Sequence, residues 1–191
     1  MQICEKKTSG AKYKKMRNMI GKIKKFDQSM SDIYDTKARD VIKECLGAIV
    51  QDNPETYAED MVLCADLPYT HIELQVYGKW VADTFPYPFP YVYERKLKFR
   101  ATTLFVCFNA HYDRFIMFAR TAIHPKPYRL EKYAREIVHY VPWNKSITQP
   151  TSKLNINMMR MFGNTGLDLD DEIDTEDSKP DASNAESTLS G

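Results

Sequence analysis

The chain of 191 residues lacks several features that would place it in a familiar class. No apolar run is long enough to cross a bilayer as a helix, and no apolar segment of a secretory signal follows the basic N-terminus. The seven glycines are scattered and form no phosphate-binding loop. Neither G-x-S-x-G nor H-x-x-x-H occurs, so serine-hydrolase and paired-histidine metal chemistry have no support.

Cysteines are also few, and the four that occur form no C-x-x-C pair. This spacing supports neither a zinc site nor a disulfide framework. Cys45, Cys64 and Cys107 lie in apolar runs, which predicts buried thiols. We therefore expect an intracellular protein of the cytoplasm or the nucleus.

The formal net charge of +1 hides a strong segregation of charge along the chain. Residues 1–25 hold nine Lys or Arg and one acid, whereas residues 167–191 hold nine acids and one Lys. We expect a basic N-terminal arm (1–28) with an amphipathic helix over 12–26, a folded domain (29–162) and a disordered acidic tail (163–191). A basic arm suits a polyanionic partner, and an acidic tail suits solubility or a protein partner.

Hydrophobic periodicity predicts the elements of the middle segment. A helix is expected over 31–51, a hairpin of strands over 61–65 and 70–77, a buried strand over 102–109, a strand over 115–119 and a helix over 128–138. The order of these elements predicts an α/β (α+β) fold with a mixed central sheet.

Prolines interrupt the aromatic segment 83–93, DTFPYPFPYVY, and exclude it from the interior of a sheet. Two uses of its rings remain open. They pack onto the domain, or they stack on nucleic-acid bases.

Three polar side chains are expected to converge on the hairpin. Asp60 precedes the first strand, and Glu73 and Gln75 share one face of the second because side chains alternate along a strand. Two carboxylates from neighbouring strands form a hard oxygen site suited to Mg²⁺ or Mn²⁺. Such a site can support metal-assisted cleavage of a phosphodiester, with a neighbouring polar group positioning the water.

Asp60, Glu73 and Gln75, on a hairpin preceded by a helix, resemble the motif of the PD-(D/E)XK (restriction endonuclease-like) nuclease superfamily. The resemblance covers residues 31–140 and implies an αβββαβ core. It places the metal ligands of the family at Asp60 and Glu73, and its catalytic Lys at Gln75. Some restriction enzymes of this fold carry Gln at that position. The implied function is metal-dependent cleavage of nucleic acid, with DNA ahead of RNA, by a protein that pairs as a homodimer.

Basic residues near the motif are expected to touch phosphates: Lys79, Arg95, Lys96 and Lys98. Either Lys79 or Lys96 could also supply the positive charge that Gln75 lacks. Lys79 and Lys96 could each instead be an ordinary solvated lysine on the surface.

Three other acids compete with the motif residues or supplement them. Asp66 rivals Asp60, although a turn also favours Asp at that position. Asp40 or Glu44 on the first helix could add a metal ligand, or simply face solvent.

Two alternatives to an active nuclease remain open. The same fold could bind nucleic acid without cutting it, because Gln75 replaces Lys. It could also serve as a structural or interaction protein whose arm and tail bind opposite partners, with a phage or viral origin that would suit the charged termini.

Overall fold

The computed structural model describes residues 28–164, except residue 56 and residues 132–135. The expected arm, with its helix over 12–26, lies outside the described residues except for its last position. The expected acidic tail lies outside them beyond residue 164.

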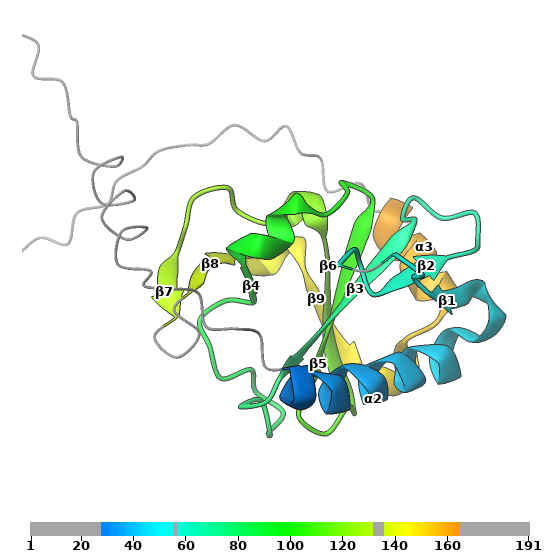
Figure 1. The fold of residues 1–191 in the computed structure, drawn as a ribbon, viewed down its shortest axis with the longest axis horizontal. Coiled ribbons are helices and arrows are strands. Elements are labelled where there is room, and N and C mark those ends of the chain that lie inside the picture. The colour runs from blue at the N-terminus through cyan, green and yellow to red at the C-terminus, as the bar shows by residue number, and fades with distance from the viewer. Residues whose placement is uncertain (1–27, 56, 132–135, 165–191) are drawn as a thin grey trace, which may run out of the picture.

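The described residues form a large mixed sheet, a small sheet and the α-helices α2 and α3, arranged as in Figure 1. The large sheet has the strand order β1-β2-β3-β5-β6-β9, in which β3 and β5 are parallel and all other neighbours are antiparallel. Its strands are β1 (Val50–Asp52), β2 (Met61–Leu63), β3 (His71–Tyr77), β5 (Thr103–Asn109), β6 (Arg114–Ala119) and β9 (Ile147–Pro150). The predicted mixed α/β fold is therefore present.

The small antiparallel sheet has the order β4-β8-β7. Its strands are β4 (Tyr91–Tyr93), β8 (Glu136–Tyr140) and β7 (Arg129–Glu131). The helices are α2 (Gln28–Leu46) and α3 (Ile156–Asn164), and short 3-10 turns span Gly47–Ile49, Glu94–Lys98, Arg120–Ala122, Trp143–Lys145 and Thr151–Lys153. We call the turn Glu94–Lys98 η2.

Alternation along the central strands divides the core into two halves. Leu74 of β3 and Val106 of β5 pack in one buried cluster with Ile42 of α2 and Met159 of α3. Phe105 and the neighbouring odd-numbered residues pack on the other side, in a cluster that includes residues of β4 and β8. The two helices thus cover one face of the large sheet, and the small sheet covers the other.

The hairpin and the two following strands match the prediction. β5 is buried at all seven positions, as expected for the segment 102–109, and β6 follows it after a tight turn. The helix predicted over 31–51 instead ends at Leu46. Gly47 has a φ of +61°, a conformation that commonly terminates helices, and Val50 then pairs with Leu63 in the strand β1.

The helix predicted over 128–138 is wrong, because the described parts of this segment form β7 and the start of β8. Its apolar spacing suited a helix, but β4 presents an edge whose backbone groups need partners. β8 supplies them through pairs such as Val92 with His139, and Ile137 and Val138 are buried. Tertiary pairing has overridden local pattern here.

The aromatic segment packs onto the domain rather than forming an open surface. Phe85 contacts the rings of Tyr77 and Trp80 edge-on, with centroids 5.0 and 5.3 Å apart. Its last residues form the edge strand β4, outside the run of prolines. The packing interpretation of this segment is therefore the one that the contacts support.

The described cysteines are all free thiols. Cys107 is buried as predicted, Cys45 is half-buried, and the prediction for Cys64 is wrong because this residue is exposed beside the turn that follows β2. Neither α2 nor α3 combines the length and the apolar character needed to span a membrane, and no other described helix does.

Candidate active site

The β2–β3 hairpin brings Asp60 and Glu73 together. Its register pairs Met61 with Ile72 and Val62 with His71, so one further step places Asp60 opposite Glu73. Asp60 Oδ2 accepts a hydrogen bond of 2.8 Å from the backbone N–H of Leu74. The two carboxylates that the sequence singles out therefore lie at one end of the hairpin.

Lys96 joins this pair from η2, within the connection that leads from β3 to β5. Its Nζ lies 2.6 Å from Glu73 Oε1 and donates to the Leu74 carbonyl at 3.2 Å. The Glu73 and Lys96 side chains are only 6% and 13% exposed. Lys96 is one of the two lysines considered as a source of positive charge, and it contacts Glu73 of the motif directly.

Arg39 of α2 contacts the other carboxylate. Its guanidinium lies 2.5 Å from Asp60 Oδ1, donates to the Asp60 carbonyl as well, and reaches Asp52 at 3.2 Å. Sequence reasoning missed Arg39. The available signal was its position four residues after Asp35, which puts both side chains on one face of the helix.

Burial shapes the protonation of this group. Burial, opposed by Lys96 and reinforced by the nearby Asp60, raises the pKa of Glu73 to about 7. Burial also raises the pKa of Asp60, against the effects of Lys96, the Leu74 N–H and Arg39. Burial alone would lower the pKa of Lys96, but Glu73 and Asp60 hold it above its ordinary value.

Two buried side-chain oxygens of β3 have unused hydrogen-bonding capacity. Gln75 donates from Nε2 to the Tyr91 carbonyl at 3.2 Å. Gln75 Oε1 and Glu73 Oε2 are buried and find no hydrogen-bond partner among the described residues. A buried acceptor without a donor is costly unless a ligand or water completes it, so both atoms are candidates for contact with a ligand.

These residues line a cleft of about 1070 Å³, which extends from α2 across the hairpin to η2. Arg95 and Lys98 line it together with Lys96, and their contact with phosphates stays a prediction. Lys79 does not line this cleft and is exposed in the turn after β3.

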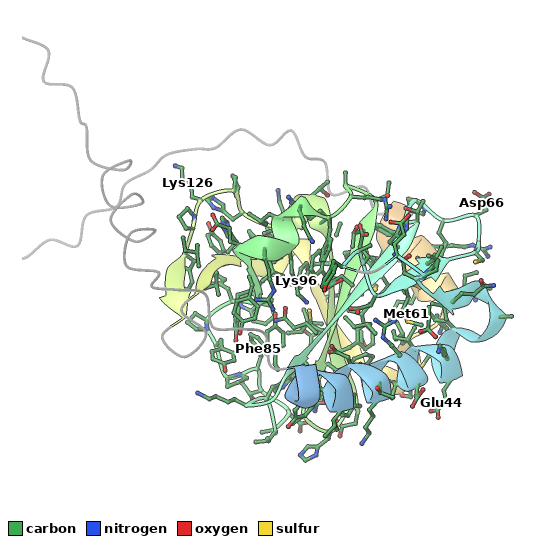
Figure 2. The ribbon with its side chains drawn as sticks, viewed as in Figure 1. Glu44, Met61, Asp66, Phe85, Lys96 and Lys126 are labelled. Atoms are coloured by element: carbon green, nitrogen blue, oxygen red, sulfur yellow. The ribbon has the colours of Figure 1, made fainter. Side chains whose placement is uncertain are left out.

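The other acids considered as ligands lie elsewhere. Figure 2 shows Lys96 in the middle of the molecule, Asp66 at its outer edge and Glu44 on the outer side of α2. Asp40 is also exposed. Asp35 is the helix acid that lines the cleft, and its charge contributes to the raised pKa of Asp60.

Two carboxylates, those of Asp60 and Glu73, line the cleft. No group of three or more His, Cys, Asp or Glu side chains with metal-binding geometry occurs in the described part of the chain. Mg²⁺ commonly takes only one or two carboxylates from a protein and completes its shell with water and substrate phosphates. Asp60 and Glu73 are two such carboxylates, but both Asp60 oxygens accept hydrogen bonds, from Arg39 and from the Leu74 N–H, which leaves Glu73 Oε2 and Gln75 Oε1 as the oxygens without a partner among the described residues.

Glu59, next to Asp60, has a structural role that the sequence did not reveal. It is 3% exposed, and its carboxylate accepts hydrogen bonds from the Arg100 backbone and side chain and from the Thr103 hydroxyl. These contacts fix the chain immediately before Asp60 against the start of β5.

Comparison of the chain with protein-family models, with curated proteins and with solved structures found no significant match. What the cleft does is therefore inferred from its own residues.

Proposed function

We propose that this protein is a metal-dependent nuclease of the PD-(D/E)XK type. The observation that carries the proposal is the contact of Lys96 with Glu73, beside Asp60, in the cleft. A buried ion pair contributes little net stability because both charges lose their hydration. Buried ionisable groups with shifted pKa values in a cleft are more typical of functional sites.

The order of elements supports the proposal. α2 is followed by the antiparallel strands β1, β2 and β3 of the large sheet, then by β4 of the small sheet, the helical turn η2 and β5, which is parallel to β3. This order corresponds to αβββαβ if the elements of the small sheet are set aside and η2 takes the place of the second helix. The assignment differs from the expected one, in which residues 102–109 formed the third strand and residues 128–138 the second helix.

In this proposal, four residues of the chain have distinct roles. Asp60 and Glu73 would hold the cation, Gln75 Oε1 would accept a hydrogen bond from a water in the cleft, and Lys96 would take the place of the Lys that the motif has at position 75. Because its pKa is raised, Lys96 is an ammonium at neutral pH and stabilises negative charge rather than accepting a proton. Bound Mg²⁺ or Mn²⁺ supplies charge stabilisation at the phosphate and a more acidic water.

The ion pairs favour one competing function, binding without cleavage. Arg39 and Lys96 already offset the charges of Asp60 and Glu73, so the site is close to neutral before a cation binds. In that case the protein would bind nucleic acid but not metal.

Cleavage assays with Glu73→Ala separate these functions. Wild-type protein should cut labelled DNA or RNA with Mg²⁺ or Mn²⁺, and Glu73→Ala should lose at least about a hundredfold in rate while keeping the wild-type circular dichroism spectrum. Calorimetric titration with Mn²⁺ should show binding by the wild type and none by the variant. Equal cleavage by both proteins would remove Glu73 from the site, and nucleic-acid binding without metal binding would favour the inactive alternative.

A further inference from the structure

The most exposed large side chain near the carboxylates is Tyr57. It is 87% exposed, lines the same cleft and precedes Asp60 by three residues. Its position on the rim of the cleft places an aromatic face beside the proposed cleavage centre.

The backbone of Tyr57 is held in an unfavourable conformation. Its φ is +66°, in the left-handed region that residues other than Gly, Asn and Asp rarely adopt. Lys98 Nζ donates to its carbonyl at 2.9 Å, and the loop closes through a hydrogen bond of 3.1 Å from Asn53 N–H to the Asp60 carbonyl. These two hydrogen bonds restrain the backbone from which the exposed ring extends.

A comparison within the chain shows why this position is unusual. Tyr112 also has a positive φ, of +62°, but its ring is buried, contacts Phe108 and donates from its hydroxyl to the Tyr34 carbonyl. Packing explains an aromatic residue there. At Tyr57 the ring is in solvent, so Gly or Asn would suit the backbone better, and the ring has no comparable packing role.

Other rings and cations lie along the same cleft. Tyr34 of α2 is 44% exposed and lines it, and Tyr93 carries the Arg95 guanidinium over its ring at 4.7 Å. Exposed rings interleaved with cations are typical of proteins that bind single-stranded nucleic acid by stacking.

Stacking, and not charge, distinguishes a single strand from a duplex at this cleft. The lining contains five acids and four cations, so charge alone gives the cleft little attraction for any nucleic-acid backbone. Stacking on an exposed ring adds affinity only for a base that is not already stacked within a duplex.

We propose that the cleft binds single-stranded nucleic acid, with an unpaired base stacked on Tyr57. The inference rests on the proposed nuclease function, for which it names the class of substrate.

Binding measured without metal tests this inference separately from cleavage. Full-length protein in EDTA is titrated into labelled single-stranded DNA, single-stranded RNA and a DNA duplex of the same sequence, and anisotropy is recorded. Tyr57→Ala should weaken single-strand binding by roughly tenfold or more and leave duplex binding unchanged. Tyr57→Phe should bind as the wild type, and so should the control Tyr128→Ala, which removes a half-exposed ring outside the cleft.

A spectroscopic signal reports the stacking itself. A single strand with one 2-aminopurine should lose fluorescence on binding to the wild type and to Tyr57→Phe, but not on binding to Tyr57→Ala. The inference is overturned if Tyr57→Ala binds and quenches as the wild type does, or if the wild type binds the duplex in preference to single strands. Cleavage of a duplex by the wild type, lost in Glu73→Ala, would leave the nuclease proposal standing in that case.

Discussion

At Glu73, burial and the neighbouring Asp60 raise the pKa to about 7, although Lys96 Nζ is only 2.6 Å away. The residue is thus poised between its neutral and its charged form near physiological pH. A structural ion pair on the surface would not show this, because water would keep the carboxylate ionised. Carboxylates with pKa values shifted in this way cluster at functional sites.

The raised pKa predicts a pH dependence of stability. The folded protein binds the Glu73 proton more tightly than the unfolded chain, so the stabilisation is complete below pH 4.5 and is lost as the pH rises to about 7. The change is on the order of 3 kcal/mol. Urea unfolding between pH 4.5 and 8 should therefore show a smaller fall in the free energy of unfolding for Glu73→Gln than for the wild type. Parallel curves for the two proteins would contradict this assignment.

At the residue scale, the sequence predicted which side chains lie near each other when those residues are close along the chain. Strand alternation and the short turn were enough to place Asp60 near Glu73 and Gln75. Lys96 could be raised as a candidate, but its place depends on the path of the connection between β3 and β5, which local pattern does not encode. Arg39 and Glu59 were missed because each acts through an element distant in sequence.

Between elements, Arg39 ties α2 to the hairpin that carries the site. It hydrogen-bonds both the side chain and the carbonyl of Asp60, and both side chains are partly buried. Lys43, one turn further along the helix, instead pairs with Asp52 where both side chains are largely exposed. Arg39 and Lys43 therefore allow a partly buried ion pair to be compared with an exposed one on the same helix.

Arg39→Met should lower the free energy of unfolding by about 2 kcal/mol, because it leaves charged and polar groups of Asp60 without their partner. Lys43→Met should cost less than about 1 kcal/mol, as exposed ion pairs contribute little. Urea denaturation of both variants measures the difference. Equal effects would show that Arg39 does not hold the helix to the hairpin.

The elements that sequence reasoning mistook share a physical cause. α2 ends just before Gly47, although the apolar stripe alone predicted that the helix continues. Val50 instead pairs with Leu63 in the large sheet. The segment 128–138 has helical spacing, yet β8 forms because β4 offers a strand edge. Such choices depend on contacts with distant strands, whereas the continuous apolar character of β5 was sufficient to identify a central strand.

In the molecule as a whole, the large sheet is covered on one face by the helices and on the other by the small sheet. The cleft runs from α2 to η2 past the hairpin, and Lys96, from the connection between β3 and β5, contacts the hairpin carboxylate of Glu73. The mixed class of the fold was predictable from the order of helical and extended segments. The second sheet was not, since its strands are separated in sequence by the whole of β5 and β6.

The proposed cleavage requires Lys96 to supply the positive charge that the family's motif provides with a Lys at position 75. The most direct test compares metal-dependent cleavage by the wild type, Lys96→Met, Lys98→Met and the double variant Lys96→Met/Gln75→Lys. Lys96→Met should lose about a hundredfold or more in kcat, Lys98→Met should keep the wild-type kcat, and the double variant should regain cleavage because the ammonium returns to the same carboxylates. A Lys96→Met protein that cleaves at the wild-type rate would contradict the account.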